Sequence, residues 1–140
     1  MSVDIRPAVD RIVKKIYGRA EALSFQAANE LRNSELSVLR GKRSGRVYRR
    51  PASRRKYTAS APGEPPAVRS GILRNSWGSR TSSVRAGKTL ILKPSIATSI
   101  KYARYLEDGT KKMAPRPYQD KIIEHAVPRV LRIYKNLHRL

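Results

Sequence analysis

The sequence predicts an α+β domain, because two stretches with helical periodicity flank a middle segment rich in strand and turn signals. The chain has 140 residues, which suits one domain with one modest core. We therefore expect a single domain over residues 1–140. Its parts should be a long N-terminal helix, a small antiparallel sheet with a projecting basic hairpin, and a C-terminal helix packed on the sheet.

The first helix is predicted from residue 4 to about residue 34. Apolar residues recur there at spacings of three and four, as one face of a helix requires. They are Ile5, Val9, Ile12, Ile16, Ala20, Leu23, Ala27 and Leu31. Pro7 suits a first helical turn, and Asn33 with Ser34 offers a stop. We interpret the stripe as a face that covers a core, not as a coiled-coil seam.

The next segment, residues 37–70, is strongly basic, with ten Lys/Arg against one acidic residue. Helical periodicity stops, and short strand-like pieces at residues 39–40 and 46–48 lie around two glycines. We predict a long hairpin or extended loop at about residues 40–60, which cannot fold alone because it has few apolar residues. The candidates for contact with DNA or a protein partner are Arg49, Arg50, Arg54, Arg55 and Lys56.

A three-stranded antiparallel meander is predicted next. Its strands are expected at residues 71–83, 89–93 and 96–100. Residues 85–87 supply the first turn, and Pro94 with Ser95 separates the second strand from the third.

The C-terminal helix is predicted from just after Pro117 to about His138. Its apolar face comprises Ile122, Ile123, Ala126, Val130, Ile133, Tyr134 and Leu137. Pro128 lies within this pattern and removes one backbone hydrogen bond, so the helix either bends there or begins later.

Charge and cysteine content narrow the function classes. The chain has no cysteine, which excludes disulfides and thiolate metal sites and fits synthesis in a reducing cytosol. It lacks an apolar run long enough for a secretion signal or a membrane span, so we expect neither. The net charge of +21 lies almost entirely after residue 36, since the first 36 residues hold six Lys/Arg and five Asp/Glu. Such an excess indicates a polyanion or an acidic protein as partner.

No arrangement of residues indicates catalysis or metal binding. The triplet at residues 87–89 resembles the end of a phosphate-binding loop, but Ser82 stands where that motif needs glycine. His125 and His138 lie thirteen residues apart without a second pair of ligands. We therefore expect that this protein is not an enzyme and that it binds neither a cofactor nor a metal ion.

Two short segments carry more specific information. The first, residues 61–76, contains Pro65 and Pro66, which fix an extended chain because each proline restricts itself and its predecessor. The second comprises residues 102–110 and 113–118. There Tyr102 and Leu106 fit one face of a short helix that Gly109 ends in a left-handed conformation.

These segments resemble two signatures of the tail-completion, or head-to-tail joining, proteins of tailed bacteriophages. Residues 62–76 are similar to that family's PGEPP stretch with Gly-x-Leu-Arg-x-Ser, and residues 102–118 to its YAxxLExGT and APRPF stretches. The chain has Tyr118 where phenylalanine is frequent and Ser70 where threonine is frequent. The matching residues to which we assign a structural role are Pro62, Gly63, Pro65, Pro66, Gly71, Leu73, Tyr102, Ala103, Leu106, Glu107, Gly109, Thr110, Arg116 and Pro117.

The resemblance implies a structural virion protein of the phage neck, made in the host cytoplasm and without a membrane. Such a subunit joins a ring, six-fold in this family, although the isolated chain can be a monomer. The ring bridges the head-closure or connector complex and the tail tube or tail terminator, and genomic DNA passes through it. We also expect Glu107 and Arg116 to pair, because they are charged members of the second segment.

Alternatives remain open at this stage. The chain can be a free-standing, sequence-independent nucleic-acid-binding protein, which its charge favours, or a minor tail component of the same virion. The basic loop can face DNA in the ring lumen, dock on an acidic neighbour or be merely solvated.

Overall fold

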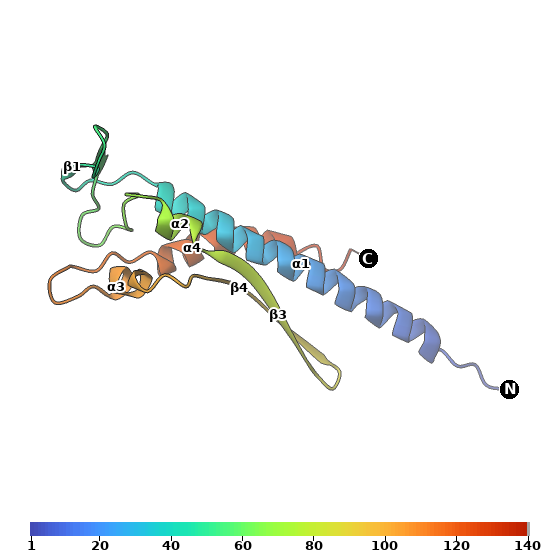
Figure 1. Ribbon diagram of the computed structural model, residues 1–140. Helices are drawn as coiled ribbons and strands as arrows, with labels where there is room; N and C mark the ends of the chain where they lie inside the picture. Colours follow the sequence, from blue (N-terminus) through green and yellow to red (C-terminus); the bar gives the residue numbers. More distant parts are fainter. Residues whose placement is uncertain (140) are drawn as a thin grey trace.

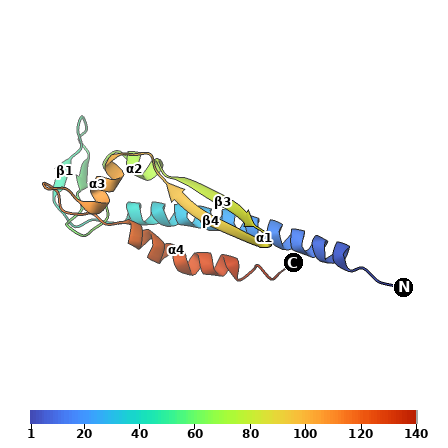
Figure 2. The same cartoon turned by 90° about the horizontal axis from the view of Figure 1, so that it is seen from below.

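Helix α1 forms the axis of the molecule. The computed structural model describes residues 1–139. Its elements are α1 (Arg6–Arg40), β1 (Val47–Arg49), β2 (Lys56–Thr58), α2 (Ile72–Asn75), β3 (Gly78–Ala86), β4 (Thr89–Ala97), α3 (Tyr102–Asp108) and α4 (Gln119–Tyr134). The β3–β4 hairpin and α4 lie along α1, and the shorter elements gather near its C-terminal end (Figures 1 and 2). The predicted α+β fold class is confirmed.

Helix α1 is 35 residues long and continues past the predicted stop at Asn33 and Ser34. The stop prediction is wrong because Ser34 is buried between two helices, where its Oγ lies 3.0 Å from Nδ1 of His125 on α4. Further along the helix, Leu39 is buried in the core, and this burial stabilises the helical conformation beyond Ser34. The strand-like piece at residues 39–40 is therefore helical.

The main sheet is one two-stranded ribbon. Strands β3 and β4 pair in antiparallel register from Gly78 opposite Ala97 to Ala86 opposite Thr89. Residues 96–97, predicted to begin a third strand, instead end β4, so the sheet has two strands. Pro94 lies within β4, because a strand with a single partner has a free edge where a missing N–H is tolerated. The first predicted strand begins later than expected, since residues 72–75 form the helical turn α2.

The predicted basic hairpin is confirmed as a second, separate ribbon. Strands β1 and β2 pair from Val47 opposite Thr58 to Arg49 opposite Lys56. Tyr48 and Tyr57 face each other across the ribbon with ring centroids 6.0 Å apart. This cross-strand aromatic pair supplies apolar contact in a segment rich in polar and basic residues.

The core lies where the C-terminal end of α1 meets α4. Leu39, Tyr118 and Ile122 are buried there, and Trp77 and Ile96 pack against them. Since Ile122 belongs to the first turn of α4 and Ile96 to β4, the predicted packing of the C-terminal helix on the sheet is confirmed.

Helix α4 begins near the predicted position and ends at Tyr134, four residues before the predicted end at His138. It contains Pro128, which is exposed to solvent. Of the two readings the sequence allows, the later start is therefore wrong.

Candidate interaction surfaces

The two recognisable segments meet in space. The backbone N–H of Gly63 donates to the carbonyl of Pro115 over 3.2 Å, and Nζ of Lys121 donates to the carbonyl of Gly63 over 3.1 Å. Within the second segment, the N–H of Arg116 donates to the carbonyl of Leu106 over 2.7 Å. Residues separated by about fifty positions therefore build one surface at the end of α1 (Figure 1).

Glu64 fixes the first segment in place. Its carboxylate accepts hydrogen bonds from the N–H of Ser44 (3.0 Å), the Oγ of Ser44 (2.5 Å) and the N–H of Ala61 (2.9 Å). These bonds, led by the Ser44 hydroxyl, lower the pKa of Glu64 to about 2. The following residues, Pro65 and Pro66, are buried.

The lowered pKa of Glu64 predicts a pH dependence of stability. Its folded-state value of about 2 lies below the usual 4.5, so its contribution is present above pH about 4.5 and lost as the pH falls through about 2. Glu64→Gln is expected to flatten this part of the acid unfolding curve, measured by circular dichroism. Asp120→Asn, which removes an exposed carboxylate elsewhere, is the control. Equal acid sensitivity of Glu64→Gln and the parent chain would contradict the prediction.

Glu107 has a different partner from the one predicted. Its Oε2 accepts hydrogen bonds from the N–H of Tyr118 (2.9 Å) and of Gln119 (3.2 Å), where α4 begins. The first N–H groups of a helix have no intrahelical acceptor and favour a negative charge, which explains the preference. Among residues 1–139 there is no ion pair between Glu107 and Arg116, so that prediction is wrong.

Tyr118 locks α3 against α4. Its hydroxyl donates to the carbonyl of Ala103 over 3.0 Å, and its ring meets Trp77 edge to face at a centroid distance of 5.9 Å. Burial, followed by the charges of Glu107 and Asp108, raises the pKa of Tyr118 to about 12. The hydroxyl therefore has a fixed hydrogen-bond partner, the carbonyl of Ala103, which a phenylalanine at this position would lack.

We predict that Tyr118→Phe destabilises the chain by about 0.5–1.5 kcal/mol, because the hydrogen bond from the tyrosine hydroxyl to the carbonyl of Ala103 is lost. Denaturant unfolding measures the change. The raised pKa means that the tyrosine's contribution is present below pH about 10 and lost as the pH rises through about 12, so the difference between the two chains should shrink in alkali. An exposed control is Tyr105→Phe, for which no loss is expected. A neutral Tyr118→Phe result contradicts the assigned role.

Gly109 ends α3 at the predicted position, with a positive φ of 77°, but its ψ of −178° is extended and differs from the predicted left-handed helical conformation. A Cβ at this position would lie 2.9 Å from the carbonyl oxygen of Met113 and from the backbone N of Pro115. Both the positive φ and the close approach of the following loop therefore require glycine. The bridge between Thr110 and Met113 closes this loop.

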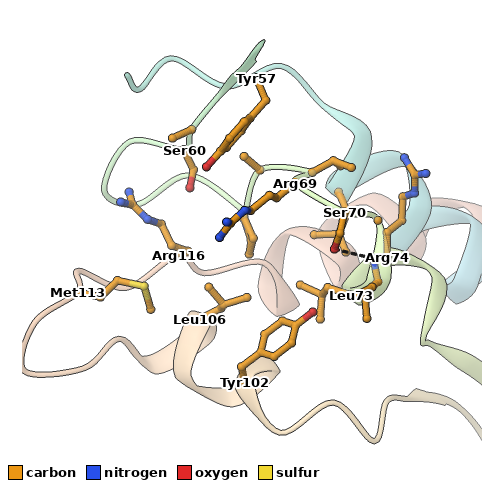
Figure 3. A pocket seen from close by; sticks show the side chains of 17 residues that line it. Tyr57, Ser60, Arg69, Ser70, Leu73, Arg74, Tyr102, Leu106, Met113 and Arg116 are labelled. Atoms are coloured by element: carbon orange, nitrogen blue, oxygen red, sulfur yellow. Dashed lines mark hydrogen bonds between the residues drawn. The ribbon is translucent and has the colours of Figure 1, made fainter. Parts of the chain in front are cut away.

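A hollow of about 720 Å³ lies between the two segments. Tyr57 of β2 and the loop before α2 form one side, and Tyr102 and Leu106 of α3 form the other (Figure 3). Arg116 also lines it, so the predicted motif residues Pro66, Gly71, Leu73, Tyr102, Leu106 and Arg116 contribute to one site. We call it the α3 hollow.

The five basic candidates of the hairpin do not line the α3 hollow. Arg49, Arg54, Arg55 and Lys56 are exposed on the β1–β2 ribbon and its connecting turn, while Arg50 is half-buried. Tyr48 and Tyr57 of the same ribbon pack against each other. The hairpin is thus a separate basic projection (Figure 1).

The sequence did not identify two uncovered apolar stripes. Ile5, Val9 and Ile12 form the α1 stripe and are 45–67% exposed, although we predicted that they cover a core. Ile123, Val127 and Leu131 form the α4 stripe and are 46–57% exposed. The turn of the β3–β4 hairpin reaches only as far as Tyr17, whose hydroxyl donates to the carbonyl of Lys88, so the first turns of α1 extend past it (Figure 2).

Within residues 1–139 no group of three or more His, Cys, Asp or Glu side chains could hold a metal ion. Of the helices in that range, none is both long and apolar enough to cross a membrane. In comparisons with known proteins, no family model, no curated protein and no solved structure matches this chain.

Proposed function

We propose that this chain is a structural ring subunit of the neck of a tailed bacteriophage. In this role it joins the head-closure or connector complex to the tail tube, lets genomic DNA pass and catalyses no reaction. The resemblance of residues 61–76 and 102–118 to joining proteins supports the location in the virion. That these segments build one surface supports treating them as a unit.

The two uncovered stripes are the observation that carries the proposal. They lie on different helices and consist of different residues, so one stripe of a subunit can pack on the other stripe of its neighbour. Contacts between two different surfaces repeat in one direction around a ring and close when the rotation permits. A two-fold dimer in which one stripe packs on its own copy would leave the other stripe uncovered, whereas a dimer that pairs the α1 stripe with the α4 stripe twice would cover both and differs from a ring in its number of subunits. The six-fold symmetry of the ring comes from the family resemblance alone.

Virions made without this chain test the joining role. The expected particles are filled heads and finished tails that remain unattached, as seen by electron microscopy, with attachment restored when the chain is supplied in trans. Particles that are joined but defective elsewhere would favour a minor tail component. Normal particles would overturn the proposal.

The second candidate, a free-standing nucleic-acid-binding protein, is favoured by the net charge of +21 and by the exposed hairpin cations. Phosphate contacts by such cations weaken steeply as the salt concentration rises. A gel shift on random duplex DNA at physiological salt should be weak if the neck role is correct. Strong binding that disappears when Arg49, Arg54, Arg55 and Lys56 are changed to glutamine would support the second candidate.

A further inference from the structure

The α3 hollow combines an apolar floor with a basic rim. Leu39, Leu73, Leu106 and Met113 line its apolar part, and Leu39 and Leu106 connect it with the core. Arg69, Arg74 and Arg116 line its edges, and none of the residues that line it is acidic. Figure 3 shows the guanidinium group of Arg69 in the space between Ser60 and Leu106.

Two of these arginines have N–H groups without a partner among the described residues. Nη1 of Arg116 and Nε of Arg74 are buried and donate no hydrogen bond to any acceptor within residues 1–139. A buried donor without an acceptor is costly, and an arginine fork matches a carboxylate better than any neutral acceptor. The hydroxyl groups of Tyr57 and Ser60 add hydrogen-bonding capacity beside Arg69 (Figure 3). The rim therefore fits a carboxylate.

The floor argues against a ligand that is only an anion. A free phosphate would leave the leucine side chains bare, and a DNA backbone needs a long basic track instead of an enclosed apolar base. A volume of about 720 Å³ can take two or three side chains of an extended peptide. Charge complementarity and apolar lining together select an acidic peptide with a large apolar residue.

We propose that the α3 hollow binds a short segment of a partner protein that carries a large apolar side chain beside a carboxylate. The apolar side chain enters between Leu73 and Leu106, and the carboxylate binds Arg69 and Arg116. This inference rests on the proposed function in one respect only, namely that the partner is another protein of the virion. Binding itself requires neither ring assembly nor DNA.

The test uses the full chain and fluorescein-labelled peptides measured by fluorescence anisotropy at physiological salt. The panel contains acetylated pentapeptides in which leucine, phenylalanine or methionine stands next to aspartate or glutamate. Two matched sets replace the acid by its amide or the apolar residue by serine. We expect the acidic–apolar set to bind and each matched set to bind about tenfold more weakly or worse.

Arg69→Gln, an exposed position that should not disturb folding, is expected to weaken peptide binding about tenfold, and Arg69→Gln/Arg116→Gln further. The control Arg54→Gln/Arg55→Gln removes two positive charges from the hairpin, as many as Arg69→Gln/Arg116→Gln removes from the hollow. This control should bind the peptide as tightly as the parent chain does. The proposal is overturned if no peptide binds, if the control loses as much as the rim variants, or if serine replacement has no effect. Competition by single-stranded DNA that depends on Arg69 and Arg116 would assign the hollow to nucleic acid instead. Peptide binding without ring formation separates this inference from the proposed function.

Discussion

Replacing Glu35 by alanine is expected to lower the free energy of unfolding by about 3–5 kcal/mol. Glu35 is fully buried and forms an ion pair with Arg32 one helical turn earlier. Burial, followed by the charges of Arg74 and Arg40, lowers the pKa of Arg32, so three guanidinium groups lie close enough to repel. Removing the carboxylate of Glu35 leaves the guanidinium groups of Arg32, Arg40 and Arg74 without the negative charge that offsets their repulsion. Urea unfolding monitored by Trp77 fluorescence measures the loss.

Two variants separate the buried charge from a general effect of substitution. Glu30→Gln removes a partly exposed carboxylate 3.8 Å from Arg129 and should cost less than about 1 kcal/mol. Arg32→Leu/Glu35→Leu removes both charges and should be more stable than Glu35→Ala, since a buried pair replaced by apolar residues is often neutral. A Glu35→Ala chain as stable as the Glu30→Gln chain would show that the pair contributes little.

The parts of the fold that depend on local sequence were predicted well. Helical spacing identified α1 and α4, turn residues identified the basic hairpin, and Gly109 identified the end of α3. Each of these signals acts over a few residues, where backbone geometry and side-chain spacing decide the conformation. The class of fold followed from their order along the chain.

The errors concern residues whose partners are distant in sequence. From local sequence Ser34 was predicted to end a helix, but it lies inside α1 and contacts His125 of α4. Pro94 was predicted to break a strand, but β4 tolerates it because this strand pairs with β3 alone. Glu107 was predicted to pair with Arg116 because their charges are opposite. Its carboxylate instead accepts hydrogen bonds from the N–H groups that begin α4, which have no acceptor within the helix. Likewise, periodicity showed that Val9 and Ile12 share a face but could not show that no other part of residues 1–139 covers it.

The same uncovered face gives the second large effect. Val9→Lys/Ile12→Lys on the α1 stripe, or Ile123→Lys/Val127→Lys on the α4 stripe, is expected to abolish assembly, because burying lysines against an apolar stripe is unfavourable. Each variant should remain folded, since these side chains are already about half exposed in the single chain. If the contact joins the two different stripes, an equal mixture of the variants should form a dimer and nothing larger. The dimer would be held by the one intact pair of stripes. Sedimentation velocity on virion-derived or concentrated protein resolves these species.

The absence of cysteine makes the geometry directly testable, because introduced thiols have no native competitor. Val9→Cys/Val127→Cys should cross-link under oxidation into a ladder that ends at the closed ring, and its last rung counts the subunits. Each single-cysteine variant should stay monomeric on a denaturing gel, and a mixture of the two singles should stop at a dimer. Efficient dimers from Val9→Cys alone would instead indicate a symmetric pairing of α1 stripes. That pairing cannot propagate around a ring, since a self-complementary contact uses the same surface of both subunits.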